Sequence, residues 1–343
     1  MSSRSDQHSP DTRSPQTPGP DTRGADTLEA VGESAALARI FPRLPAAASA
    51  LLGPGDDAAV VAAPDGRFVV TTDMMIHGPD FRLAWSTPHD LGWKAAASNL
   101  SDVAAMGAVP SALVVAIAAP ADSPVGLLEG IADGLRDACE ALSPGCGVVG
   151  GDLSVSGTLT IAVTAFGDLE GRAPVLRSGA RVGDVVAVAG VLGEAASALR
   201  LLFADAVDDR GEPDAALAAA LRPAAAAQLT PRPPIWAGPV AARGGATAML
   251  DLSDGLAIDS GRLAAASGVG IDFEGRLLGD DSALALAGGE DHSLLATFPA
   301  GAALPEGFRR IGVCVDGSGI GVDGVAYDPA GWDPYRDWSG SAG

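Results

Sequence analysis

The chain has a single lysine, Lys94, among its 343 residues, and this scarcity excludes several kinds of phosphate site. There is no G-x-x-x-x-G-K-[ST] motif, so a P-loop NTPase is excluded, and so is a protein kinase that needs a lysine on a strand. No G-x-G-x-x-G opens a helix after a strand, which argues against a dinucleotide-binding fold. The four histidines form no His-x-x-x-His pair, which argues against zinc hydrolase chemistry.

Cysteines and long apolar runs are also scarce. Cys139, Cys146 and Cys314 have no metal-ligand spacing, so we expect reduced cysteines without a chemical role. No apolar run approaches the ~20 residues that a membrane-spanning helix needs. Residues 1–26 are polar, rich in Ser, Pro and Asp, and contain no hydrophobic segment of a secretory signal. We therefore expect a disordered tail at residues 1–26 and a cytoplasmic protein.

Lys and Arg are also scarce relative to Asp and Glu, and the formal net charge is −21 at pH 7. Such a chain repels nucleic acid and anionic membranes, so neither is expected as a partner. It would also repel a bare nucleotide, and a polyphosphate ligand would therefore need bridging Mg²⁺. Part of the acidity can simply keep an alanine-rich chain soluble.

Strands and helices alternate after residue 27, in a chain that is long enough to bury a large core. A change of composition near Gly167–Pro174 predicts two domains, 27–170 and 171–343. Thr87-Pro88 is a typical helix start, and the helix is expected to reach about Gly107. A β-branched run from Arg67 predicts a strand that ends on Asp73.

Three further strands are expected. Gly147–Asp152 predicts a short strand that runs into a glycine turn, Val185–Ala189 predicts a second strand, and Ala246–Leu250 predicts a third that ends on Asp251. On the helix after Pro88, Asn99 and Asp102 are three residues apart, so they should share a face.

Against these scarcities, the chain is rich in acidic clusters, and most of them follow an apolar run. A carboxylate at a strand end beside Gly, Ser or Thr suits a hard cation such as Mg²⁺. One such cluster is common turn chemistry, but six predict a site for several metal ions and, through them, phosphates. The six are Gly55-Asp56-Asp57, Thr71-Thr72-Asp73, Asn99-Leu100-Ser101-Asp102, Gly150-Gly151-Asp152, Asp251-Leu252-Ser253-Asp254-Gly255 and Gly288-Gly289-Glu290-Asp291.

The cluster Asp251–Gly255 is the sharpest of these signals. Its two acids lie on either side of a strand-to-helix turn, where a helix N-terminus attracts phosphate. The alternative interpretation is that Ser253 or Asp254 caps the helix.

The blocks GDDAAVV, TTDM, WKAAASNLSDVAAMGAVP, GGDLS, LRSGARVGD, LTPRPP, DLSDGL and GGED occur in this order. The set resembles the thiamine-monophosphate kinase family, within the ATP-binding superfamily of aminoimidazole ribonucleotide synthetase. The resemblance runs from about residue 29 to Trp338. It implies an α/β N-terminal domain whose sheet pairs across a homodimer and an α+β C-terminal domain, in an aminoimidazole ribonucleotide synthetase-like fold.

The resemblance also implies roles for residues that match the family's motifs. Metal-binding positions are Asp57, Thr71, Thr72, Asp73, Asp102, Asp152, Asp251 and Asp254. Nucleotide-binding positions are Gly151, Asp152, Arg177 and Ser253. Glu290 and Trp332 match positions that contact the thiamine half of the substrate, and Asp80 stands where many relatives have a substrate-contacting histidine.

The implied activity is phosphorylation of thiamine monophosphate by ATP, assisted by several Mg²⁺ ions. The acceptor is a phosphate monoester that is largely dianionic at pH 7, so no residue is needed as a general base. The alternatives are another ATP-using member of the superfamily, such as aminoimidazole ribonucleotide synthetase or selenophosphate synthetase. A catalytically inactive nucleotide-binding or Ca²⁺-binding module is a further alternative, although no EF-hand loop is present.

Overall fold

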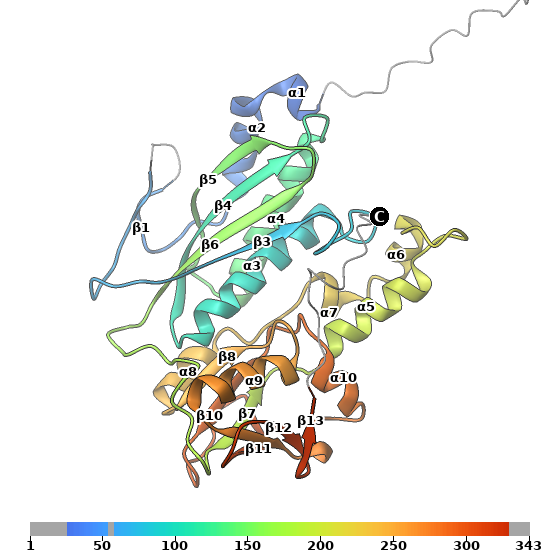
Figure 1. Cartoon of the computed structure of the whole chain (residues 1–343). Helices are drawn as coiled ribbons and strands as arrows, with labels where there is room; N and C mark the ends of the chain where they lie inside the picture. Colours follow the sequence, from blue (N-terminus) through green and yellow to red (C-terminus); the bar gives the residue numbers. More distant parts are fainter. Residues whose placement is uncertain (1–25, 54–57, 329–343) are drawn as a thin grey trace, which may run out of the picture.

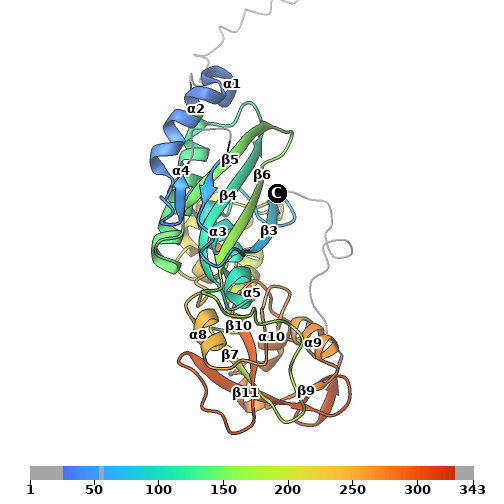
Figure 2. The same ribbon diagram turned by 90° about the vertical axis from the view of Figure 1, so that its left-hand side faces the viewer.

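Two β-sheets organise the chain, and they come from successive halves of the sequence. The structure is a computed structural model, and it describes residues 26–53 and 58–328 (Figure 1). A four-stranded sheet forms one lobe and a seven-stranded sheet forms the other, one above the other in the side view of Figure 2. The change of sheet falls between Asp168 and Val185. This mixed α/β architecture agrees with the expected fold class, and the domain boundary near residue 170 stays a prediction.

The four-stranded sheet has the order β3-β6-β4-β5. Strands β4 and β5 are parallel, and the other neighbours are antiparallel. The strands are β3 (Val69–Ile76), β4 (Val109–Ala119), β5 (Val148–Val155) and β6 (Thr160–Asp168). The sequence prediction was wrong about two strand ends, because Asp73 and Asp152 lie within β3 and β5. Ladder pairing with β6 and β4 carries both strands past their acidic residues.

Helix α3 (Pro88–Ala105) lies on one face of this sheet, and α4 (Val125–Leu142) packs against it (Figure 1). Thr87 and Asp90 form a capping box with Pro88 in the first turn, which confirms the predicted helix start. The two helices meet through glycines. A Cβ on Gly92 would lie 2.0 Å from the carbonyl oxygen of Ile131, so only glycine permits this approach.

The seven-stranded sheet has the order β13-β12-β9-β11-β7-β10-β8 and is antiparallel except where β12 runs parallel to β9. Its strands are β7 (Val185–Ala189), β8 (Ala248–Asp251), β9 (Gly270–Phe273), β10 (Leu294–Phe298), β11 (Phe308–Val315), β12 (Gly319–Val322) and β13 (Val325–Tyr327). Helix α9 (Leu256–Ser267) packs on β8, β9 and β12. The predicted strand at 185–189 and the predicted end of the next strand on Asp251 are confirmed.

A single apolar core joins the two lobes. Leu100 and Val103 of α3 belong to the same buried cluster as Met249 of β8 and Phe298 of β10. Helix α8 (Ala237–Arg243) also contacts α3 from the second lobe. Helix α3 is therefore packed by both lobes along much of its length, and most of its residues are buried.

Three helices from the alanine-rich segment form a smaller cluster beside the second lobe. They are α5 (Glu194–Asp205), α6 (Ala215–Leu221) and α7 (Ala226–Leu229). The indole Nε1 of Trp85 donates to the carbonyl oxygen of Ala206 at 2.9 Å, and Arg222 forms an ion pair with the buried Asp90. These contacts attach the cluster to the chain that leads into α3.

The remaining elements are short. They are α1 (Leu28–Val31), α2 (Glu33–Ile40), η1 (Phe41–Arg43), β1 (Ala50–Leu52), β2 (Val60–Val61), η2 (Gly275–Leu277) and α10 (Ser282–Ala287). Within the described ranges, no helix has the length and apolar character needed to cross a membrane.

The glycine contact between α3 and α4 can be tested with Gly134→Ala. A Cβ at Gly134 would lie 2.0 Å from the carbonyl oxygen of His89, so the helices must separate. We expect the free energy of unfolding to fall by about 1–3 kcal/mol in urea unfolding. Gly126→Ala in the same helix is the control, because a Cβ there meets no atom within 4 Å. Equal effects of the two substitutions would contradict this account of the helix contact.

Candidate active site

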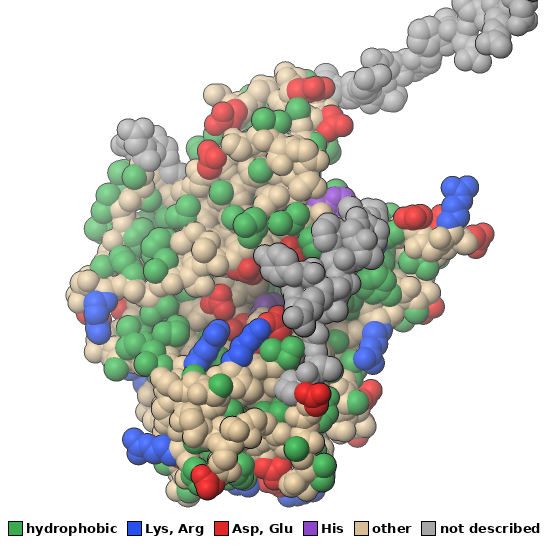
Figure 3. All heavy atoms as spheres, viewed as in Figure 1, with side chains coloured by type: hydrophobic (Ala, Val, Ile, Leu, Met, Phe, Trp, Pro, Cys, Tyr) green, Lys and Arg blue, Asp and Glu red, His purple; other side chains and the backbone are tan. Residues whose placement is uncertain are grey.

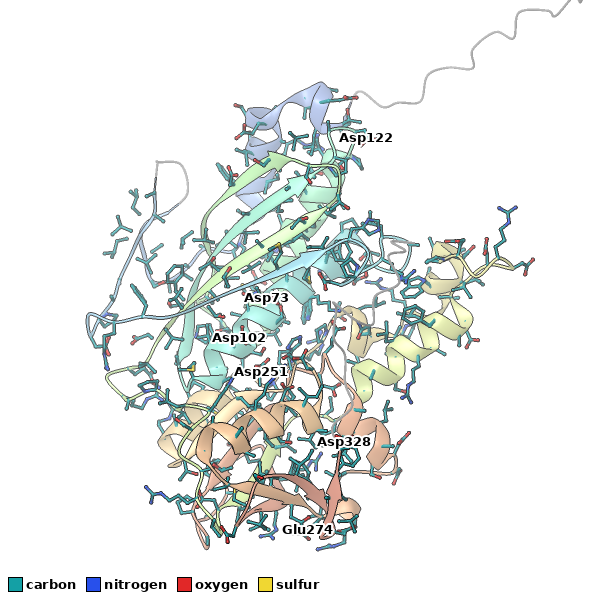
Figure 4. The ribbon with its side chains drawn as sticks, viewed as in Figure 1. Asp73, Asp102, Asp122, Asp251, Glu274 and Asp328 are labelled. Atoms are coloured by element: carbon teal, nitrogen blue, oxygen red, sulfur yellow. The ribbon has the colours of Figure 1, made fainter. Side chains whose placement is uncertain are left out.

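A cavity of about 630 Å³ lies where the two lobes meet. Its walls come from β3, α3, the loop at 78–86, α5, α7, the β8–α9 turn and the loop at 287–292. Acidic side chains gather in the hollow between the lobes (Figure 3). Asp73 on β3, Asp102 on α3 and Asp251 at the end of β8 follow one another across the lobe boundary (Figure 4).

Helix α3 presents Lys94, Ser98 and Asp102 to this cavity at intervals of four residues. Four residues make about one helical turn, so these side chains lie above one another. The predicted pair of Asn99 and Asp102 is therefore not the face that lines the cavity. Asn99 is buried, and its amide nitrogen donates to the carbonyl oxygen of Ala95 at 2.9 Å.

The half-buried Asp102 and the buried Asp251 form the centre of the acidic group. Thr71 Oγ1 donates to Asp102 Oδ2 at 3.0 Å, and Ser101 Oγ donates to Asp251 Oδ2 at 3.2 Å. Nδ1 of the buried His292 lies 3.3 Å from the same Asp251 oxygen. Burial, and then the charge of Asp251, raise the pKa of Asp102 to about 7 against the hydrogen bond from Thr71. The ionised Asp102 is thus a destabilised charge that a cation would stabilise.

Thr71 and Thr72 point to opposite faces of the sheet, as successive residues of a strand must. Thr71 reaches Asp102 on the helix-covered face. Thr72 is bonded on the open face, where Thr164 Oγ1 lies 3.1 Å from its Oγ1. Thr72 also borders the cavity, but the two hydroxyls do not converge on one point.

The turn after β8 is held by a residue that the sequence analysis missed. Asp259 Oδ2 accepts the backbone N–H groups of Ser253 at 3.0 Å, Asp254 at 2.9 Å and Gly255 at 3.2 Å. Arg262 Nη1 links Asp254 Oδ2 at 2.5 Å with Asp259 Oδ1 at 2.6 Å. These three N–H groups precede the helix, so phosphate binding at the helix N-terminus stays a prediction. The capping alternative is wrong, since the N-cap is Gly255 and no side chain caps it. The sequence signal for this role was the position of Asp259, an acidic residue in the first turn of α9.

The two acidic residues of the loop Gly288-Gly289-Glu290-Asp291 make different contacts. Asp291 accepts the backbone N–H groups of Gly193 and Ala195, the latter at 2.8 Å, and so holds the start of α5. Glu290 faces the cavity, where Lys94 Nζ lies 2.8 Å from its Oε2 and Gln228 Nε2 donates to the same oxygen. Lys94 and Gln228 are polar cavity residues that the sequence analysis did not select as site residues.

Two more expected residues border the cavity, three lie elsewhere, and two are outside the described residues. Ser253 and Asp80 are in its wall, and Asp80 Oδ2 accepts the backbone N–H of Ile76 at 2.7 Å. Arg177 is exposed and is not part of the cavity wall. The remaining expected positions are Gly151 and Asp152 on β5, at the sheet edge opposite β3, and Asp57 and Trp332, which lie outside the described residues.

The donor set of the cavity fits Mg²⁺ rather than a softer metal. Asp73, Asp102, Asp251 and Asp254 offer carboxylate oxygens, and Asp102 is destabilised when it is ionised. Among residues 26–53 and 58–328, however, no three acidic, histidine or cysteine side chains converge tightly enough to hold an ion by themselves. Mg²⁺ commonly takes only one or two protein carboxylates and fills its shell with phosphate and water oxygens. These residues therefore fit an ion that is shared with a phosphate ligand.

Comparison with known proteins decides the family. Residues 55–169 match the family described as AIR synthase related protein, N-terminal domain. A thiamine-monophosphate kinase of Mycobacterium tuberculosis is 43% identical over 326 residues, which is 91% of this chain and 92% of that protein. The chain belongs to the thiamine-monophosphate kinase family.

Solved structures of the family have the same fold. The thiamine-monophosphate kinase of Stenotrophomonas maltophilia K279a matches with a TM-score of 0.69 and 34% identity, covering 86% of this chain and 96% of that one. A structure named "AaThiL complexed with AMPPCP and TMP" matches with a TM-score of 0.68 and 34% identity, covering 81% and 90%. The resemblance inferred from the sequence blocks is thereby confirmed.

The raised pKa of Asp102 predicts how stability depends on pH. The carboxyl titrates at about 7 in the folded chain, against a reference value of 3.8. Between these values the folded state binds more protons, so the free energy of unfolding should fall as the pH rises from about 4 to about 7. Asp102→Asn cannot ionise, so it should lack this decrease and be more stable than the wild type at pH 8.

Thermal unfolding with a chelator present measures this difference. A variant that is less stable than the wild type at pH 8 would contradict the repulsion assigned to Asp102.

Proposed function

We propose that this chain transfers the γ-phosphoryl group of ATP to the phosphate of thiamine monophosphate and so forms thiamine diphosphate. The observation that supports this most directly is the composition of the cavity. One part of its wall is acidic, with Asp102, Asp251 and Asp254, and another is apolar and aromatic, with Phe81 and Trp85. The first suits metal-bound phosphates, and the second suits a flat organic ring.

The relatives support the same activity. A family structure that matches along 81% of this chain is described with AMPPCP, an ATP analogue, and with TMP. Aminoimidazole ribonucleotide synthetase and selenophosphate synthetase activities are less favoured, because the curated relatives of this chain are thiamine-monophosphate kinases. The absence of a lysine-containing phosphate loop agrees with a kinase that relies on acidic residues.

In this reaction the protein residues bind and orient the two phosphate groups. Asp73, Asp102, Asp251 and Asp254 would hold Mg²⁺, with the Thr71 hydroxyl fixing Asp102, and Asp57 would join them. When bound, Mg²⁺ offsets the negative charge that otherwise separates the phosphates from each other and from this acidic wall. The acceptor oxygen of a phosphate monoester is already deprotonated, so no side chain has to remove a proton. Glu290 would contact the thiamine half with Asp80 beside it, and Ser253 would contact the nucleotide. The family resemblance assigns a thiamine contact to Trp332 and a nucleotide contact to Arg177, although Arg177 is not in the cavity wall of this chain.

Asp152 lies at a distance from this cavity within one chain. Strand register places it in one row with Ala116 of β4, Ala162 of β6 and Met74 of β3, on the face away from α3. That row also crosses the full width of the sheet, which is about 14 Å at ~4.8 Å per strand. Asp152 and Gly151 therefore act, in our proposal, in the site of a second copy.

The open face of the four-stranded sheet supports a homodimer. Val70 and Met74 lie on this face of β3 and are 60% and 52% exposed. Exposed apolar side chains of this kind are typical of surfaces that meet a partner. Pairing of this face with its copy brings Gly151 and Asp152 of the partner subunit toward the cavity. We place this dimer in the cytoplasm, with no nucleic acid or membrane as a partner.

The activity is tested by incubating the purified chain with MgATP and thiamine monophosphate and measuring thiamine diphosphate by chromatography. Asp102→Asn keeps the shape of the side chain but removes one charge from the site. We expect kcat to fall about 10²-fold or more, which corresponds to about 2.7 kcal/mol of transition-state stabilisation. Near-normal turnover of this variant at saturating Mg²⁺ would contradict the assignment of Asp102. No product from the wild type would contradict the proposed function itself.

A mixing experiment tests whether the site is shared between subunits. Asp102→Asn and Asp152→Asn chains are each expected to be nearly inactive. After joint unfolding and refolding, about half of the dimers are mixed, and each mixed dimer has one site with both carboxylates intact. The mixture should therefore regain up to about a quarter of the wild-type activity per chain. If both carboxylates served a site within one chain, mixing would restore nothing.

A further inference from the structure

Arg262 of α9 holds two carboxylates at once, and one of them belongs to the cavity wall. Its Nη1 lies 2.5 Å from Asp254 Oδ2 and 2.6 Å from Asp259 Oδ1. Asp254 is part of the wall, whereas Arg262 and Asp259 are not. A ligand in the cavity would therefore meet Asp254, and Arg262 can act on that ligand only through this carboxylate.

The three side chains are anchored unequally. Asp259 is buried, and its Oδ2 accepts the backbone N–H groups of residues 253–255, so its carboxylate is fixed. The side chains of Arg262 and Asp254 are 46% and 32% exposed. Within residues 26–53 and 58–328, the Asp254 carboxylate accepts a hydrogen bond from Arg262 alone, and its Oδ1 is left for another partner. The Arg262–Asp254 pair is thus the part of this group that can respond to a ligand.

The neighbouring carboxylates repel each other, and Arg262 offsets that repulsion. Burial raises the pKa of Asp259 to about 6, and the charges of Asp254 and Asp251 add to this effect. A hydrogen bond from the N–H of Asp254 and the charge of Arg262 oppose it. Arg262 thus supplies positive charge at a place where negative charges accumulate.

A guanidinium and a divalent cation are rivals for one carboxylate. Arginine is not deprotonated in proteins, so its charge is always present. It repels a cation that approaches Asp254, whether that cation displaces the guanidinium or binds the free oxygen. Phosphate oxygens that accompany the cation bring negative charge, which offsets this repulsion.

We propose that Arg262 is the counter-ion of Asp254 in the free chain and weakens the binding of a divalent cation that arrives without phosphate. Arg262 is then a positioning residue, and the site takes up cations together with its phosphate ligands. The inference rests on the proposed metal-assisted reaction and concerns how that site controls its cations. It agrees with the finding that no three metal-binding side chains converge among the described residues.

The experiment measures cation binding in the absence of ATP and thiamine monophosphate. Mn²⁺ is the probe, because binding removes the paramagnetic resonance signal of the free ion, and Mg²⁺ added in competition gives its affinity. Arg262→Gln removes the charge but keeps a hydrogen-bond donor. We expect its Kd for the cation to fall about 3- to 10-fold at low ionic strength, and the difference to shrink with added salt. Arg262→Lys keeps the charge and should stay near the wild-type value.

Arg310→Gln is the matched control. Arg310 Nε lies 2.7 Å from Glu274 Oε1, its side chain is 46% exposed like that of Arg262, and neither partner is in the cavity wall. The substitution changes the net charge by the same amount, so its Kd for the cation should remain that of the wild type. In a second control, adding Arg262→Gln to Asp254→Asn should not tighten binding, because the carboxylate through which Arg262 acts is gone.

Four outcomes would overturn the inference. They are a Kd of Arg262→Gln that is unchanged or higher, equal tightening in Arg310→Gln, tightening that persists with Asp254→Asn, and an Arg262→Lys variant that behaves like Arg262→Gln. An arginine that only supported the turn would give a weaker cation site when removed, which is the opposite sign. Thermal unfolding without metal verifies that the compared chains are folded. Tightening in a chain that forms no thiamine diphosphate would contradict only the proposed function.

Discussion

The site depends on one buried helix that is packed by both lobes. Glycine contacts bring α4 against one side of α3, while β8, β10 and α8 pack from the second lobe. Because the helix cannot shift without opening the core, Lys94, Ser98 and Asp102 are held at fixed places in the cavity wall. The loops of the second lobe then meet these side chains through Glu290 and Asp251. The rigid helix thus positions groups that flexible loops alone could not fix.

Charge is balanced differently at two positions on this helix. Lys94 and Glu290 neutralise each other, so that position needs no external ion. Asp102 accepts a hydrogen bond from the Thr71 hydroxyl and lies near a second carboxylate, and burial together with the charge of that carboxylate raises its pKa to about 7. Carboxylates that lie close together in this way lower the stability of the folded chain, and a cation bound beside them would offset that loss. The structure therefore separates a self-contained ion pair from two neighbouring carboxylates whose charges repel each other.

The sequence predicted the local features well and the long-range contacts poorly. Thr87, Pro88 and the apolar runs were sufficient for the start of α3 and for β7, because caps and periodicity act over a few residues. The sequence analysis identified the acidic residues of the cavity from the short motifs in which they occur. The contact between Lys94 and Glu290 spans 196 positions, and nothing near either residue indicates it. The length of β3 was also missed, since its extension past Asp73 depends on pairing with β6. Asp259 was missed although its signal was local.

The alternation of side chains along β3 explains why one chain holds only part of the expected site. Thr71 and Asp73 share the helix-covered face, and Thr71 there supports Asp102, whereas Thr72 and Met74 face the other way with Asp152. A slip by one residue would exchange these sets, and the buried helix face prevents it. The sheet thus presents one group of polar residues on its helix-covered face and another on its open face, although Thr72 and Met74 of the second group also border the cavity. In the dimer that we propose, a second copy on the open face would bring the two groups together.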